Sequence, residues 1–247
     1  MRYQRSNCMP HKEHMTFQPL TPRLSMLRLG MVNCYLYESA RGPILIDCGN
    51  PGDGPKILAA LQQRNHHPAD LSIIATHLHV DHIGALAALQ AAGAPAAHMS
   101  PLDGAAVAQG NWIRPMHFAG PFVWFEDGIN RRMVATQRGA PARVQPDAAD
   151  GVELGDELTV IATPGHSMGH ISLYSPADGG ILICGDAAVH FTAQPNISFL
   201  YEDKMAAIES VKRIAGMSFA HAVFGHGKPL LGSADRAFTL RAARLKQ

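Results

Sequence analysis

The stretch that decides the fold is Leu71-Ser72-Ile73-Ile74-Ala75-Thr76-His77-Leu78-His79-Val80-Asp81-His82, in which an apolar run passes directly into histidines and an aspartate. The apolar part predicts a strand that is buried on both faces. His77 and His79 are two residues apart, so in an extended loop their side chains point the same way. Asp81 and His82 then lead into a predicted helix. Imidazole and carboxylate groups together suit zinc, iron or manganese, and a simple solvated histidine loop is a poor alternative here.

Three later segments also place a histidine or an aspartate directly after an apolar run. Taken singly, each is ambiguous, because glycine and proline favour turns in which polar residues are common. His166 is either a turn residue or a ligand, Asp186 fits an ordinary turn aspartate, and His226 has a turn interpretation of equal weight. The segments are Thr163-Pro164-Gly165-His166, Ile183-Cys184-Gly185-Asp186 and Phe224-Gly225-His226-Gly227.

Strands and helices are interleaved along the chain, and a coarse duplication is visible, which is typical of α/β proteins with buried sheets. We expect an N-terminal tail over residues 1–22 and one domain over residues 23–247. Residues 110–150 have no clear periodicity, and so long an irregular segment is typical of a lid or a pocket wall; it is also a candidate dimer surface. Strands are predicted at 24–29, 32–37, 43–49, 71–76, 158–163, 170–175, 180–185 and 221–225, and helices at 56–64, 81–92, 101–109, 203–215 and from 234 onward.

Composition excludes several classes of protein. The chain has 247 residues, 47% of them hydrophobic and 17% charged, which excludes extended disorder. A formal net charge of +1 and the lack of a Lys/Arg run argue against a nucleic-acid partner. No apolar run is long enough to cross a membrane, and the N-terminus lacks the apolar core of a secretory signal, so we expect a cytoplasmic protein. The four cysteines are widely spaced, which favours free thiols over a disulfide framework.

The order of the motifs, HxHxDH, then TPGH, then GD, then GHG, resembles that of the metallo-β-lactamase superfamily from about Leu24 to about Gly227. The resemblance implies an α/β fold of four layers, an αββα sandwich in which two mixed sheets pack face to face with helices outside. It also implies a cleft for two divalent metal ions at the edge of the sheets. Zinc is the favoured metal, with manganese or iron as alternatives.

The resemblance also implies a role for each matching residue. His77, His79 and His166 correspond to ligands of the first metal. Asp81, His82 and His226 correspond to ligands of the second, and Asp186 corresponds to the carboxylate between the two. Asp81 is in addition the candidate catalytic residue, as a proton acceptor or as the group that orients a metal-bridging hydroxide.

This chemistry implies hydrolysis of a small-molecule carboxylic ester, thioester or lactone, with the bridging hydroxide as nucleophile. Little chain follows His226, so the C-terminal glutathione-binding region of glyoxalase II-like thioesterases is expected to be absent. Acyl-homoserine-lactone lactonases are of similar size, but they commonly have aspartate where this chain has Gly227. The alternatives are a mononuclear iron sulfur dioxygenase, a ribonuclease Z-like phosphodiesterase and, least favoured, a non-enzymatic metal-binding module.

Several further residues are weaker candidates. His170 is interpreted either as a residue that orients a ligand or contacts substrate, or as an ordinary histidine at a strand edge. Asn33 matches a polar position of the family but also fits an asparagine satisfied by the backbone. Thr76 and Asp47 are candidates to support the metal loops. Three residues that follow Asp186 are candidates to line the pocket, with a place in the core as the default interpretation for the aromatic ones: His190, Phe191 and Tyr201.

Overall fold

The computed structural model describes residues 15–118, 126–136, 139 and 142–245. Its first sheet is mixed, with antiparallel pairing from β1 to β4 and parallel pairing from β4 to β8. The order of strands across this sheet is β1-β2-β3-β4-β5-β6-β8. The strands are β1 Gln18–Pro19, β2 Leu24–Leu29, β3 Val32–Ser39, β4 Gly42–Ile46, β5 Ser72–Ile74, β6 Ala97–His98 and β8 Val144–Gln145.

The second sheet has the order β15-β14-β12-β11-β10-β9 and is also mixed, because β12 and β14 are parallel while the other neighbours are antiparallel. A separate antiparallel pair joins β7 to β13. The strands are β9 Glu153–Leu154, β10 Leu158–Ala162, β11 Ile171–Ser175, β12 Ile181–Ile183, β14 His221–Val223 and β15 Leu230–Leu231, with β7 His117–Phe118 and β13 Leu200–Tyr201.

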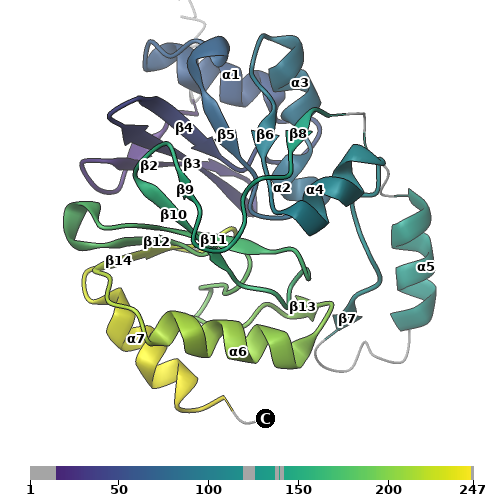
Figure 1. Ribbon diagram of the computed structural model, residues 1–247, viewed down its shortest axis with the longest axis vertical. Helices are drawn as coiled ribbons and strands as arrows, with labels where there is room; N and C mark the ends of the chain where they lie inside the picture. The colour runs from purple at the N-terminus through teal and green to yellow at the C-terminus, as the bar shows by residue number, and fades with distance from the viewer. Residues whose placement is uncertain (1–14, 119–125, 137–138, 140–141, 246–247) are drawn as a thin grey trace, which may run out of the picture.

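Helices cover the outer faces of both sheets, which confirms the expected four-layer αββα sandwich. Figure 1 shows α1 and α3 on the first sheet and α6 and α7 on the second, with α2 and α4 beside the edge where the sheets meet. The helices are α1 Gly54–Gln63, α2 Val80–Ile83, α3 Leu86–Ala91, α4 Pro101–Ala108, α5 Glu126–Thr136, α6 Lys204–Ala215 and α7 Ala234–Ala242. In the described part of the chain, no helix is long and apolar enough to span a membrane.

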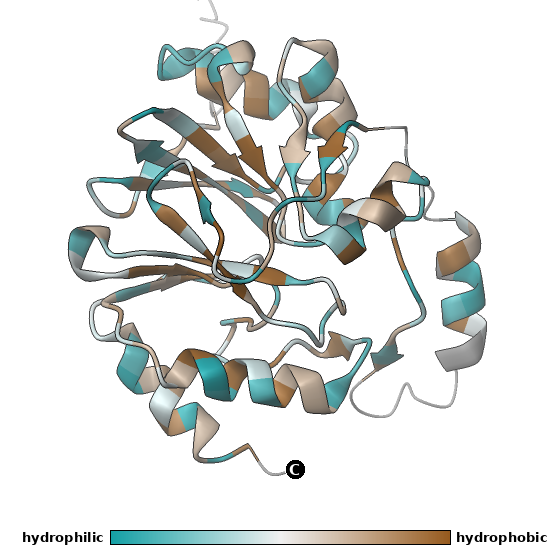
Figure 2. Cartoon of the chain, viewed as in Figure 1, coloured by the Kyte–Doolittle hydropathy of each residue, from teal (hydrophilic) through white to brown (hydrophobic). Residues whose placement is uncertain are grey.

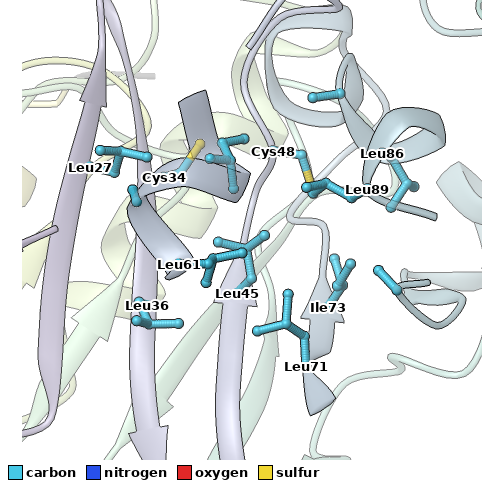
Figure 3. Packing of buried hydrophobic residues seen from close by; sticks show 14 of the residues in the cluster. Leu27, Cys34, Leu36, Leu45, Cys48, Leu61, Leu71, Ile73, Leu86 and Leu89 are labelled. Carbon is cyan, nitrogen blue, oxygen red and sulfur yellow. The ribbon is translucent and has the colours of Figure 1, made fainter. Parts of the chain in front are cut away.

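Apolar strands are buried on both faces, as their continuous apolar runs predict. One cluster of buried side chains fills the space between the sheets, including Tyr35, Ile46 and Leu173. A second cluster packs the first sheet against α1 and α3, and Figure 3 shows Leu45 and Leu61 within it. Figure 2 shows hydrophobic residues along the strands of both sheets, whereas hydrophobic and hydrophilic residues are mixed along the helices. Burial of these side chains is the main driving force for folding.

The single helix predicted over residues 81–92 is wrong, because two short helices replace it. The break lies at Gly84, whose backbone N–H donates to the carbonyl of Gly49 at 2.9 Å. A side chain at position 84 would overlap Pro51, so the loop before α1 packs directly on the helix at this point. Contact with a distant loop therefore interrupts a pattern that looks continuous in the sequence.

The irregular conformation predicted for residues 110–150 is wrong in part. Its described residues include the helix α5 and the strands β7 and β8, and β8 extends the first sheet by pairing with β6. At the other end of the chain, Phe17 is buried and β1 pairs with β2, so ordered structure begins before residue 23. Residues 1–14 of the expected tail lie outside the described residues. Of the four cysteines, Cys34, Cys48 and Cys184 are free and buried, as expected.

Candidate metal centre

All seven predicted ligands converge at one edge of the two sheets. His77, His79, Asp81 and His82 follow β5 and run into α2. The other three follow β10, β12 and β14, which are strands of the second sheet, and they are His166, Asp186 and His226. Loops that follow neighbouring strands meet at one sheet edge, which brings together residues that are far apart in the sequence.

The seven side chains form three overlapping groups, and within each group the donor atoms lie within 4.8 Å of one another. Two of them match the predicted ligand sets of the two metals, and the third connects them. The groups are His77, His79 and His166; Asp81, His82 and His226; and His77, His82 and Asp186.

The first group is a compact set of buried imidazoles. The ring centroid of His77 lies 4.6 Å from that of His79 and 4.8 Å from that of His166. Nδ1 of His79 and Nε2 of His166 are 2.9 Å apart. Three ring systems therefore direct nitrogen atoms to a common point.

Asp186 lies between the first group and the second. One of its carboxylate oxygens, Oδ2, is 3.5 Å from Nε2 of His166 and 3.3 Å from Nε2 of His226. The other oxygen, Oδ1, is 3.6 Å from Nε2 of His82. In the second group, Nε2 of His226 lies 3.2 Å from Oδ2 of Asp81. Asp186 thus contacts ligand candidates of both groups, as its predicted bridging position requires.

Four buried polar atoms of this cluster have no hydrogen-bond partner within the described part of the chain: Nε2 of His77, His79 and His82, and Oδ1 of Asp186. A buried polar atom without a partner costs about 1–3 kcal/mol, so a native protein rarely collects several at one point. A divalent cation is a partner for lone pairs of this kind, and imidazole nitrogen with carboxylate oxygen is a donor set for zinc, manganese or iron. The residues therefore fit a divalent metal centre.

Four of the imidazoles are oriented by a hydrogen bond between their Nδ1 atom and an oxygen atom of the protein. Nδ1 of His82 is 2.8 Å from Oδ2 of Asp47, and Nδ1 of His77 is 3.0 Å from Oγ1 of Thr76. Because the Thr76 hydroxyl donates to Asp47, it accepts the Nδ1–H of His77. Asp47 and Thr76 thus support the metal loop, as expected.

Backbone carbonyls do the same for the histidines of the second sheet. Nδ1 of His166 is 2.7 Å from the carbonyl oxygen of Leu200, and Nδ1 of His226 is 2.8 Å from that of Met31. A histidine ligand commonly donates its other N–H to an oxygen, which fixes the tautomer and leaves the remaining nitrogen free for the metal. Neither carbonyl was predicted, because a backbone acceptor leaves no signal in the residue type.

The electrostatic environment keeps the first group uncharged. Burial lowers the pKa of His77, His79 and His166 below that of a free imidazole, and neighbouring imidazoles lower it further for His77 and His79. Only a neutral imidazole has a lone pair for a metal. These three side chains are therefore ready to bind a cation at neutral pH.

The second group is ionised. Burial opposes the charge on His82 and His226, but nearby carboxylates outweigh it and raise their pKa to about 9 and about 11. Burial also opposes the charge on Asp81 and Asp186, but these imidazoles outweigh it and hold the pKa of both carboxyls below its usual range. Binding of a metal here would release protons, because both imidazoles must become neutral.

His170 and Asn33 form hydrogen bonds with backbone groups of the loops that carry Asp186 and His226. Nε2 of His170 accepts the backbone N–H of Asp186 at 2.9 Å, and its Nδ1 is 2.8 Å from Oγ1 of Thr163. Both ring nitrogens are thus occupied, which favours an orienting role over contact with substrate. The amide of Asn33 donates to the carbonyls of Phe224 and Gly227, on either side of His226. The interpretation of Asn33 as satisfied by backbone is confirmed, and these bonds hold the His226 loop.

A pocket of about 330 Å³ opens above the cluster. Its floor includes His79, Asp81, His166, Asp186 and His226, and the side chain of Asp81 is 32% exposed, against 4% for Asp186. The rest of the lining is Met31, Asn50, Val80, Ile113, Met116, Phe191, Ser198, Phe199 and Leu200.

Of the three residues predicted as candidates to line the pocket, only one is found in its lining. Phe191 is exposed and lines the pocket, so the default expectation of a core position is wrong for this residue. Two residues of the irregular segment, Ile113 and Met116, line it as well. Tyr201 does not, because it lies on β13 in a separate hollow with His117. Nδ1 of His190 bonds the carbonyl of Lys228, away from this lining.

Gly225 offers a direct test of how closely the cluster is packed. A Cβ at this position would overlap Oδ1 of Asp186 and Cε1 of His82. We expect Gly225→Ala to displace both side chains and to lower the affinity for added Zn²⁺ by about 10–100-fold, as disturbed ligand supports do. Isothermal titration calorimetry of the metal-free protein with Zn²⁺ measures this affinity. Gly128→Ala is the control for substitution of a glycine, because Gly128 lies in α5 and nothing lies near its Cβ position; an equal loss in both variants would contradict the expectation.

An αββα sandwich with a histidine and aspartate cluster at the sheet edge defines a class of metalloproteins. The chain belongs to the metallo-beta-lactamase superfamily, whose family pattern its residues 27–226 match. This confirms the family that the motif order indicates.

Relatives and solved structures agree with this assignment. The chain is 29% identical to "Probable metallo-hydrolase YflN" of Bacillus subtilis, covering 85% of this chain and 86% of that protein. It is 25% identical to a hydroxyacylglutathione hydrolase of Citrobacter koseri over 72% of this chain, but spans only 61% of that enzyme.

Two solved structures show the same fold. BJP-1, a subclass B3 metallo-beta-lactamase of Bradyrhizobium japonicum, has a TM-score of 0.66 at 20% identity, covering 95% of this chain and 93% of that chain. TTHA1623, in a di-iron-bound form, has a TM-score of 0.62 at 26% identity, covering 85% and 96%.

Proposed function

We propose that this protein is a metal-dependent hydrolase that binds two divalent ions, zinc by preference, and cleaves a small carboxylic ester, thioester or lactone. The observation that carries the proposal is the convergence of seven donors, five of which line the floor of a pocket, with four buried polar atoms left without hydrogen-bond partners in the described chain. His77, His79 and His166 are the proposed ligands of one ion. Asp81, His82 and His226 are the proposed ligands of the other ion. Asp186 is the shared carboxylate.

Bound divalent ions would lower the pKa of water and polarise a carbonyl oxygen. The residues of the chain hold and orient the reacting groups. Asp81 is the partly exposed carboxylate at the pocket floor, and its low pKa keeps it ionised at neutral pH. An ionised Oδ2 accepts a hydrogen bond from water and so fixes the orientation of the nucleophile, and the low pKa favours this role over that of proton acceptor. Nε2 of His226, 3.2 Å from this oxygen, restrains it.

The pocket wall favours an uncharged and partly apolar substrate. Seven apolar side chains line it, including Ile113, Met116 and Phe199. Among the described lining residues there is no lysine or arginine, and the charged groups are those of the cluster itself. Asn50 and Ser198 add neutral hydrogen-bonding groups. Beyond the proposed metal ions, a substrate with several charged groups would lack a cationic partner in this wall, which argues against a polynucleotide substrate and against specific glutathione recognition.

The comparisons support this proposal at different levels. The relative named hydroxyacylglutathione hydrolase supports cleavage of a thioester, and the di-iron form of TTHA1623 keeps iron as an alternative to zinc. A mononuclear iron dioxygenase is less well supported, because it would leave the second group of Asp81, His82 and His226 without a role. The cytoplasmic location, the small-molecule partner and the homodimer stay predictions.

The proposed function is tested by a substrate panel with the zinc-loaded protein. We expect hydrolysis of apolar lactones and of thioesters with a neutral leaving group. We expect slower turnover of S-lactoylglutathione and none of bis-p-nitrophenyl phosphate. Turnover confined to the phosphodiester, or sulfite formation from a persulfide by the iron-loaded protein, would replace the proposal with the corresponding alternative.

The apolar wall predicts that activity depends on acyl-chain length. Each methylene buried in an apolar pocket contributes up to about 0.8 kcal/mol, so kcat/KM is expected to rise by up to about fourfold per added methylene until the pocket is full. Phe199→Ala should reduce this increase and should leave an acetyl ester nearly unaffected. Leu240→Ala is the matched control, because Leu240 is 54% exposed against 55% for Phe199 and lies on α7, outside the pocket lining. An identical chain-length profile in both variants would show that the wall does not bind the acyl chain.

A further inference from the structure

A buried ionic network lies directly behind the first group of ligands. Its centre is Asp103 of α4, which is fully buried. Oδ2 of Asp103 accepts a hydrogen bond from the hydroxyl of Ser167 at 2.6 Å and another from the backbone N–H of Leu78 at 3.2 Å. Leu78 stands between His77 and His79, so one carboxylate oxygen holds both of the loops that carry the first group.

Arg114 connects Asp103 to a second carboxylate. Its Nη2 pairs with Oδ1 of Asp103, and its Nε lies 2.9 Å from Oε1 and 3.1 Å from Oε2 of Glu202. Glu202 in turn accepts the backbone N–H of Met168 at 2.9 Å. The loop that carries His166 is therefore held by two carboxylates joined through one guanidinium.

The same network also reaches the pocket wall. Arg114 lies between two residues of the lining, Ile113 and Met116. Glu202 follows shortly after Leu200, which lines the pocket and whose carbonyl orients His166. The ion pairs thus tie the apolar wall to the loops of the first group.

The packing around Gly169 is a separate observation that the loop after His166 lies close to Asp103. A Cβ on Gly169 would overlap Oδ1 of Asp103 and would approach Oγ of Ser100. The loop after His166 therefore lies against the Asp103 carboxylate with no room for a side chain. A charged group in such a position must stay paired, because a buried charge without its partner is strongly unfavourable.

We propose that Asp103, Arg114 and Glu202 form a positioning network that sets His77, His79 and His166 relative to one another for binding of the first metal ion. The inference rests on the proposed function. None of the three belongs to the donor groups, and both oxygens of Asp103 are already occupied. They act through the loops, so their loss should weaken the first group and spare the second.

Cobalt titration of the metal-free protein can separate the two groups. His226→Ala removes a ligand of the second group and His79→Ala removes one of the first, so each background reports on the other group. In the His226→Ala background, Asp103→Asn is expected to weaken Co²⁺ binding by about 10–100-fold, as residues that support ligands do. In the His79→Ala background the same change should alter Co²⁺ binding by less than about threefold, because Asp103 bonds Leu78, Ser167 and Arg114 and no residue of the second group.

Two further variants keep the test decisive if Asp103→Asn does not fold. Ser167→Ala removes one hydrogen bond, and Gly169→Ala displaces Asp103 without changing any charge. Both should weaken Co²⁺ binding in the His226→Ala background. Glu157→Gln is the matched control, because it breaks the partly buried ion pair with Arg23 at the opposite end of β10.

The outcomes distinguish this inference from the proposed function. If the unmodified protein binds no Co²⁺, the proposed function fails. If it binds Co²⁺ and the Asp103, Ser167 and Gly169 variants match the Glu157 control, the positioning network is refuted. Equal weakening in both backgrounds refutes it as well, because a general loss of stability would then explain the effect.

Discussion

Replacing His79 with alanine is expected to abolish binding of one metal ion and nearly all hydrolytic activity. Nδ1 of His79 faces Nε2 of His166 at 2.9 Å, and its ring packs edge-on against His77. Loss of a residue that merely supports a ligand costs about 10–100-fold, so loss of the ligand itself should cost more than about 100-fold in kcat. Elemental analysis and steady-state kinetics of the zinc-loaded variant measure both effects.

The control for this substitution is His98→Ala. His98 is a histidine with a side-chain partner of its own, since its Nδ1 lies 3.0 Å from Oδ1 of Asp147, but it lies outside the donor groups. We expect it to keep its full metal content and activity. If His79→Ala behaves like His98→Ala, His79 is not a ligand, and the assignment of the first group must be abandoned.

Asp186→Asn is expected to have the second large effect, because this carboxylate contacts both groups. The substitution keeps the shape of the side chain but removes the charge that faces His82, His166 and His226. A neutral amide is a poor bridge between two cations. We therefore expect the variant to retain one ion and to lose more than about 100-fold in kcat, by the same comparison with supporting residues.

The metal-free variant provides a second measurement. The Asp186 carboxylate helps to raise the pKa of His226 to about 11 and that of His82 to about 9. Without it, both values should fall, because burial then opposes the imidazolium charge with less compensation. Titration of the histidine resonances by NMR detects this shift. Unchanged pKa values together with full metal content would show that Asp186 does not lie between the groups in solution.

The metal ligands that lie close together in the sequence were the easiest to predict. His77, His79, Asp81 and His82 lie within six residues after a buried strand, so their approach to one another follows from backbone geometry. The approach of His166, Asp186 and His226 depends on the order of strands in the second sheet, which no local pattern encodes. The order of the four motifs was needed to predict that these residues meet, and the structure brings all seven together.

Residues that act through the backbone or through long-range pairing escaped prediction. The carbonyls of Leu200 and Met31 orient His166 and His226, but any residue type offers a carbonyl. Asp103 lies in a short helix with no motif around it, and its partners are distant in the sequence. Tyr201 was a candidate for the substrate pocket, but its pairing with His117 places it elsewhere.

The same limit applies to the fold. The apolar runs predicted most strands, because a strand buried on both faces leaves a continuous hydrophobic signature. The break at Gly84 was missed because it depends on the loop at Pro51, which approaches from another part of the chain. Within the segment predicted to form a lid or a pocket wall, Trp112 instead packs in the core with Met99 and Val107. Aromatic residues in such segments are more often part of the core than of a site.

The central claim is that the seven side chains hold two divalent ions, and counting the ions bound per chain tests it most directly. Protein freed of metal, loaded with Zn²⁺ and passed through a desalting column is analysed by mass spectrometry for elements. The account predicts two zinc ions per chain, and a second preparation treated with a chelator should lose its hydrolytic activity until zinc is restored. Folded protein that retains no zinc, or that hydrolyses its substrates equally well without it, would contradict the account.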